Sequence, residues 1–200
     1  MVTVCTVLPL PERPRLDAAA DGCFTTLHAA SLRDALRAAR RKRVDALVLS
    51  VHVCRGDELA GALILEMVGY RDPAPGAQTV PPLLGIDVPR TGDFLAAVGD
   101  GRSRELLDGF VAAARAAAPE LPLVPYRTRL RGWLMPLTRL SDNASFWDAG
   151  YPSLMLTDTA FLRNPHYHQQ RDTSATLDYE FMALVTEATA GAVMHATDAT

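Results

Sequence analysis

Several classes of protein are excluded by what this sequence lacks. Among its 200 residues it has only three cysteines, Cys5, Cys23 and Cys54, and no pair has the C-x-x-C spacing of a zinc-thiolate or redox site. An odd number of cysteines without regular spacing also provides no disulfide framework. We therefore interpret the three side chains as buried free thiols.

Long apolar runs are absent too. The apolar stretches at 62–65 and 153–156 are interrupted within a few residues, whereas a transmembrane helix needs about 20. The first ten residues have no basic region, and prolines follow before the core of a signal peptide develops. We expect a cytoplasmic protein that has no membrane partner.

Positive charge is not in surplus. The chain has 20 Lys and Arg against 23 Asp and Glu, a net charge of −3, and Lys42 is the single lysine. A protein that binds nucleic acid as its main partner normally needs an excess of basic residues to neutralise phosphates. The sequence therefore argues against nucleic acid, and we interpret the basic cluster at 40–43 as a solvated helix end.

The residues that are present describe a globular domain. An apolar content of 48% with 22% charged residues is ordinary for such a domain, and 200 residues lie within the usual size range. Strand and helix patterns alternate along the chain, which predicts an α/β three-layer sandwich with a mostly parallel sheet. We expect strands at 2–8, 44–54, 61–69, 93–98, 121–126 and 153–157, and helices at 31–43, 103–118, 144–149 and 177–196.

Polar side chains gather where the expected strands end. Glu66 lies near the end of one apolar run, Ser141 to Asn143 precede a short helix, and a loop holding His166, Tyr167 and His168 follows the last strand. Ligands of open α/β sheets bind at the carboxyl ends of the strands. We expect a functional site at this edge of the sheet.

Each of these residues has more than one interpretation. Glu66 could be a metal ligand or an acid/base group, or a structural carboxylate bridged to an arginine. A histidine in a loop, such as His168, could be a ligand or an ordinary surface residue. Asp142 could cap the short helix, and Asp172 could form the turn before the last helix. Trp133 and Trp147 are interpreted as packing residues.

Three phrases resemble one family. ALILEMVGY (62–70), SDNASFWDAGYPSLMLTDTAFLRNPHYH (141–168) and RDTSATLDYEFM (171–182) occur in the order found in the C-terminal half of co-catalytic zinc aminopeptidases. These are enzymes of the bacterial leucyl-aminopeptidase type, related to glutamate carboxypeptidases and glutaminyl cyclases. The resemblance covers about residues 50–200, so we divide the chain into an unmatched segment 1–49 and an aminopeptidase-like segment 50–200.

The resemblance implies roles for individual residues. It places Glu66 as a ligand of one zinc and His168 as a ligand of the other, with Tyr167 stabilising the oxyanion. Asp142 and Asp172 would be supporting residues near the site. Loops 73–89 and 127–140 would shape the specificity pocket, and the substrate would be a peptide that loses its N-terminal residue.

The sequence also departs from the family pattern. Asn143 stands where His or Tyr is usual, and Gln169 where Thr is usual. No H-x-D, D-D-N or Glu-Glu block is found, although these supply further zinc ligands and the general base. We therefore expect a truncated or degenerate member that is inactive alone and able to associate with itself through an exposed sheet edge. The alternatives are a non-enzymatic binding module and an enzyme completed by other ligands or a second chain.

Overall fold

The computed structural model describes residues 2–6, 24–28, 50–55, 58–82 and 87–198. The chain divides into two compact units, 1–50 and 51–200. In the first unit, β1 (Val2–Thr6) pairs in parallel with β2 (Phe24–His28), a strand that the sequence did not predict. The helix expected at 31–43 and the start of the strand expected at 44–54 lie outside the described residues.

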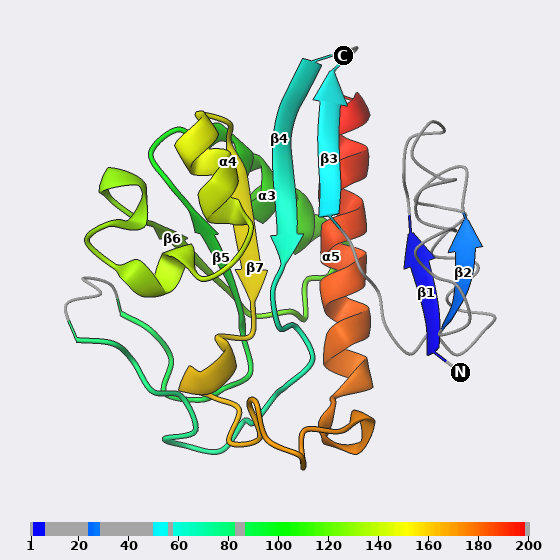
Figure 1. Cartoon of the computed structure of the whole chain (residues 1–200), viewed down its shortest axis with the longest axis vertical. Helices are drawn as coiled ribbons and strands as arrows, with labels where there is room; N and C mark the ends of the chain where they lie inside the picture. The colour runs from blue at the N-terminus through cyan, green and yellow to red at the C-terminus, as the bar shows by residue number, and fades with distance from the viewer. Residues whose placement is uncertain (1, 7–23, 29–49, 56–57, 83–86, 199–200) are drawn as a thin grey trace. The chain divides into compact units, whose positions relative to one another are not determined.

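The second unit is built on a five-stranded sheet of order β3-β4-β7-β5-β6 (Figure 1). The pairs β4/β7 and β5/β6 are parallel, whereas β5 runs antiparallel to β7. The sheet is therefore mixed, and it has helices on both faces, so the α/β class is confirmed. The strands are β3 (Ser50–Arg55), β4 (Glu58–Leu65), β5 (Leu95–Gly99), β6 (Leu123–Arg127) and β7 (Ser153–Thr157).

Apolar residues explain which strands are central. All five residues of β5 and all five of β7 are buried, because neighbouring strands flank them and both faces of the sheet are covered. In contrast, β6 is half-exposed and carries Pro125 and Arg127, two residues suited to a sheet edge. The expected strand at 61–69 ends earlier, at Leu65, because Met67 has a left-handed φ of 52° that breaks the extended conformation.

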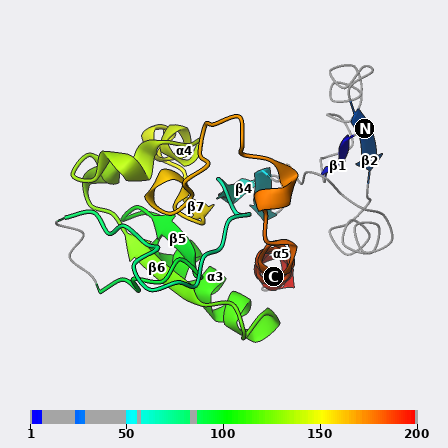
Figure 2. The same cartoon turned by 90° about the horizontal axis from the view of Figure 1, so that it is seen from below.

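Helices cover the two faces differently. Helices α3 (Arg104–Ala117) and α5 (Tyr179–Asp198) lie together on one face, and α4 (Asn143–Ala149) lies on the other (Figure 2). The main core lies between the sheet and the first two helices, and a second cluster around Trp147 and Phe94 lies on the α4 side. Within the described part of the chain, no helix has the length and apolar character needed to cross a membrane.

Candidate functional site

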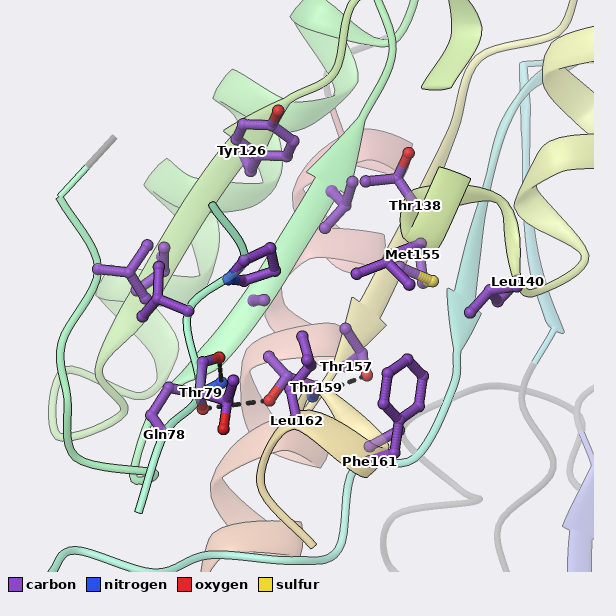
Figure 3. Close-up of a pocket in the computed structure, with 18 of the residues that line it drawn as sticks. Gln78, Thr79, Tyr126, Thr138, Leu140, Met155, Thr157, Thr159, Phe161 and Leu162 are labelled. Carbon is purple, nitrogen blue, oxygen red and sulfur yellow. Dashed lines mark hydrogen bonds between the residues drawn. The ribbon is translucent and has the colours of Figure 1, made fainter. Parts of the chain in front are cut away.

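A cavity of about 130 Å³ lies on the α4 side of the sheet (Figure 3). Figure 3 shows Tyr126 and Thr138 at one end and Thr157, Thr159 and Phe161 at the other. Most of the lining is apolar. The apolar lining residues are Val80, Pro81, Val88, Phe94, Ala96, Val98, Val124, Met135, Leu137, Leu140, Met155, Ala160, Phe161 and Leu162.

Two long loops complete the walls of this cavity. The loop expected at 73–89 contributes Gln78 to Pro81 and Val88, and the loop expected at 127–140 contributes Met135, Leu137, Thr138 and Leu140. Both loops follow or precede strands of the sheet, and their apolar residues fold over the face that carries α4. The loops that the sequence associates with specificity therefore lie on one cavity.

Glu66 reaches this cavity from the end of β4. Its backbone N–H donates to the Leu156 carbonyl at 2.9 Å, which extends the β4/β7 ladder by one residue. Its Oε2 accepts a hydrogen bond from Ser141 Oγ at 2.8 Å. Among the described residues no arginine or lysine pairs with Glu66, so the arginine-bridged interpretation is not supported there. Ser141 binds this carboxylate and does not cap α4.

Tyr167 also lines the cavity, and His168 lies against it. The two rings are stacked, with centroids 3.9 Å apart and planes 14° from parallel. The Tyr167 ring also makes a tilted contact with the Phe161 ring, and these two centroids are 5.7 Å apart. His168 has a left-handed φ of 56° and an exposed side chain. The structure thus brings Glu66 and Tyr167 to one cavity, with His168 beside Tyr167.

The other residues singled out from the sequence do not line the cavity. Asp142 is exposed and occupies the N-cap position of α4, as expected, but its side chain makes no capping hydrogen bond. Asp172 accepts a hydrogen bond from Thr176 Oγ1 at 3.4 Å in the turn before α5, as expected. Trp147 is fully buried, as predicted, whereas Trp133 is 65% exposed and lies under the Arg139 guanidinium.

Asn143 has a specific role in place of the His or Tyr of the family pattern. It is fully buried, and its Nδ2 donates to the Thr138 carbonyl at 2.9 Å. Ser153 Oγ in turn donates to the Asn143 carbonyl at 3.1 Å. The side-chain amide therefore ties the 127–140 loop to α4, and the backbone carbonyl ties α4 to β7.

A complete metal site is not formed by the part of the chain that the structure describes. Within residues 2–6, 24–28, 50–55, 58–82 and 87–198, no three His, Cys, Asp or Glu side chains lie close enough together to hold one ion. Catalytic zinc takes three protein ligands and a water molecule. Glu66 and His168 supply two candidate ligands only, so these residues do not fit a zinc centre without further ligands.

Asp158 is a residue that the sequence reasoning missed. It follows β7 directly, is fully buried, and accepts three backbone hydrogen bonds, from Gly69 and Tyr70 at Oδ2 (3.0 and 2.8 Å) and from Ala160 at Oδ1 (2.8 Å). Its own N–H donates to the Met67 carbonyl at 2.6 Å. The signal was a carboxylate at the end of a buried apolar strand, the same signal that identified Glu66.

The electrostatics of Asp158 are unusual. Burial raises the pKa of Asp158 from 3.8 to about 6, although its three N–H partners and the nearby Arg163 oppose this change. Arg163 is also buried, and its Nε donates to Gln78 Oε1 at 2.9 Å while its guanidinium lies over the Phe94 ring. A carboxylate with this pKa is partly protonated near neutral pH.

Left-handed residues surround Asp158. Met67, Thr159 and Ala160 have φ values of 52°, 74° and 46°, each costing about 1–2 kcal/mol in a residue other than glycine. The hydrogen bonds to Asp158 hold both segments in these conformations. Thr159 and Ala160 line the cavity, so this strained backbone forms part of its wall.

Comparisons with known proteins found similarity to parts of longer proteins. No family model matches it. It is 35% identical over 147 residues to the uncharacterized protein YfbL of Escherichia coli (strain K12). The matched region covers 72% of this chain and 44% of YfbL. The chain therefore spans less than half the length of this relative.

Two solved structures overlap with the fold at low identity. The LapA aminopeptidase of Legionella pneumophila is 12% identical with a TM-score of 0.47, covering 98% of this chain and 52% of LapA. LapB of the same organism is 13% identical with a TM-score of 0.47, covering 97% of this chain and 51% of LapB.

Proposed function

We propose that the cavity binds the N-terminal residue of a peptide. The apolar side chain of that residue would occupy the cavity, and its protonated amine would lie against Glu66. The chain would then be the peptide-binding part of an aminopeptidase-like protein. Hydrolysis would require metal ligands beyond those that the described residues supply.

The observation that carries this proposal is one carboxylate on an otherwise apolar cavity. An apolar cavity on the order of 150 Å³ can hold a group the size of benzene, so about 130 Å³ accommodates a leucine-sized side chain. Glu66 has a hydrogen bond from Ser141 but no cation within the described part of the chain. A half-buried carboxylate in such a place favours a ligand that brings its own positive charge.

The position of Tyr167 supports the same orientation. Tyr167 lines the cavity, and its ring stacks on His168 and makes a tilted contact with Phe161. A tyrosine hydroxyl held in this way can donate to the carbonyl oxygen that follows a peptide's first residue. We propose this role for Tyr167 and assign no proton transfer to it.

The proposed metal is zinc, as the sequence resemblance implies. Zinc would polarise a peptide carbonyl and lower the pKa of a bound water molecule. In a completed zinc site Glu66 and His168 would be the ligands from this chain, and Glu66 would then bind zinc instead of the protonated amine. Because the described residues do not complete a site, the remaining ligands are proposed to come from other parts of this chain or from a second chain. A binding module without catalysis is the alternative.

The binding proposal is tested with 3-methylbutylamine, which carries a leucine-like chain and one ammonium group. An NMR titration should give saturable shifts at residues of the cavity, and Glu66→Gln should weaken binding by about tenfold because the amide still accepts a hydrogen bond but no longer carries the charge that attracts the ammonium group. The matched ligand is 3-methylbutan-1-ol, which should bind wild type and Glu66→Gln equally. Equal binding of the amine by both proteins would contradict the role of Glu66.

The metal proposal is tested by elemental analysis. Folded protein is loaded with zinc, desalted and analysed beside His168→Ala and Glu66→Ala. Zinc that is retained by the wild type and lost in both variants would support the ligand assignment, and assays with aminoacyl-anilides would follow. Protein that retains no zinc yet binds the amine would favour the binding module.

A further inference from the structure

Two segments of the candidate site meet around the Asp158 side chain. The segment after β4 holds Glu66 and then turns at Met67, and the segment after β7 runs from Asp158 into the cavity wall. In the described structure these segments are joined by the Asp158 carboxylate and by its backbone N–H. What fixes Asp158 therefore also fixes the backbone next to Glu66.

We propose that Asp158 is the positioning residue of the cavity, holding Glu66 and the cavity wall in the geometry that binds the ligand amine. The proposal rests on the proposed function, because it concerns the same cavity. It assigns Asp158 no contact with the ligand. Its effect passes through the backbone at Met67, Gly69 and Tyr70 on one side and at Ala160 on the other.

The geometry favours a positioning role over simple packing. A buried carboxylate is costly unless hydrogen bonds compensate it, and an apolar residue of similar size would fill the same space. Asp158 instead uses both oxygens, with Oδ2 shared by Gly69 and Tyr70 and Oδ1 given to Ala160. Three convergent N–H groups need an acceptor with this shape and charge.

Arg163 is buried and joins the same two segments through further hydrogen bonds. Its Nη1 donates to the Tyr70 carbonyl at 3.4 Å, and its Nε donates to Gln78 Oε1, which also accepts from Thr159 Oγ1 at 3.1 Å. Arg163 therefore links the segment after β4, the 73–89 loop and the cavity wall. The charged or titratable groups that act on Asp158 or its partners are Arg163, Tyr70, Asp93 and Asp72.

If Asp158 positions the cavity, protonation of its carboxylate should change the affinity for the amine. A residue that only fills space would not have this effect. A protonated carboxyl loses the negative charge that strengthens its three N–H contacts, and its hydrogen takes up one acceptor position, so the hold on the Gly69, Tyr70 and Ala160 amides weakens. The affinity for 3-methylbutylamine, which stays protonated throughout, should fall about tenfold as the pH is lowered from 7.5 to 5. In Asp158→Asn the affinity should be low and independent of pH over the same range.

The experiment measures amine affinity against pH for wild type, Asp158→Asn and Asp108→Asn. Asp108 is an exposed residue of α3, so its variant should behave as the wild type does. Wild-type affinity and pH dependence in Asp158→Asn would overturn the proposal. If no protein binds the amine at any pH, the proposed function fails independently of this inference.

Hydrogen exchange in the wild type tests the role of Asp158 without the amine. It therefore applies if no protein binds the amine and also if Asp158→Asn does not fold. The amides of Gly69, Tyr70 and Ala160 should show protection factors that fall together as the pH is lowered through the titration of Asp158, while amides of β5 keep theirs. Protection that is constant with pH at all three amides would overturn the proposal.

Discussion

At the scale of single residues, two carboxylates lie at the ends of adjacent strands and differ in burial and in the number of hydrogen bonds that they accept. Glu66 lies on the cavity and accepts one hydrogen bond, whereas Asp158 is fully buried and accepts three. The difference follows from the strand that each one ends. β7 is the middle strand of the sheet, so a residue that follows it is covered on every side.

Asp158 should make the stability of the protein depend on pH. Its folded pKa of about 6 lies above the unfolded value, so the group contributes most to stability below about pH 4, and this contribution is lost as the pH rises through about 6. The loss is on the order of 3 kcal/mol by linkage. Urea unfolding from pH 4 to 7 should show this decrease in the wild type relative to Asp158→Asn.

A constant difference between the two proteins over that range would contradict the raised pKa. The expected decrease in stability is compatible with tighter ligand binding at higher pH. Ionisation of a buried carboxyl costs solvation energy for the whole fold, yet the ionised form accepts all three local hydrogen bonds.

At the scale of elements, the helix pair α3 and α5 sets how closely the layers pack. Gly191 of α5 faces Ala117 of α3, and a Cβ built at Gly191 would lie 2.5 Å from the Ala117 Cβ. α5 begins at Tyr179, two residues after the start expected from the sequence, and Asp178 Oδ1 accepts the Phe181 N–H at 2.9 Å. Asp178 also pairs with Arg71 at 3.1 Å, which joins the helix start to the segment after β4.

Two glycine variants should have opposite effects. Gly191→Ala should lower the free energy of unfolding by about 1–3 kcal/mol because the helices would have to separate. Gly109→Ala on α3 has no atom within 4 Å of the added Cβ and should raise it by up to about 1 kcal/mol through helix propensity. Urea unfolding of both variants compares them directly, and a stabilised Gly191→Ala would contradict the close approach.

At the scale of the whole molecule, the α4 layer is attached to the sheet through Trp147. This side chain is fully buried, and its Nε1 donates to the Ser153 carbonyl at 3.0 Å at the start of β7. The sheet has β3 and β6 as its edges. Self-association through an edge strand stays a prediction, and β6 opposes it with Pro125 and Arg127.

The two tryptophans should report separately on this layer. Trp147→Phe removes a hydrogen bond and leaves a cavity, so it should destabilise the protein by about 1–3 kcal/mol. Trp133→Phe changes a side chain that is 65% exposed and should stay within about 0.5 kcal/mol of the wild type. Acrylamide should quench most of the emission of Trp147→Phe and little of that of Trp133→Phe, and the reverse pattern would contradict the assignment.

The sequence by itself determined most elements of the second unit and predicted the edge of the sheet at which the candidate site lies. Periodic apolar residues predicted β5, β7, α3 and α5 closely, because each buries a face whose repeat is local in the chain. Glu66 and Tyr167 were identified from strand ends and from the family resemblance, and both lie on the cavity. Their roles as zinc ligand and oxyanion donor stay predictions.

Only the tertiary structure decided which side chains meet. Ser141 bonds to Glu66 across 75 positions, and Asp158 holds the backbone at Gly69 across 89, distances over which no sequence pattern repeats. The antiparallel placement of β5 beside β7 and the exposure of Trp133 likewise depend on how layers pack. Burial and convergent hydrogen bonds are properties of the folded chain, so the charge state of Asp158 could be read only from the structure.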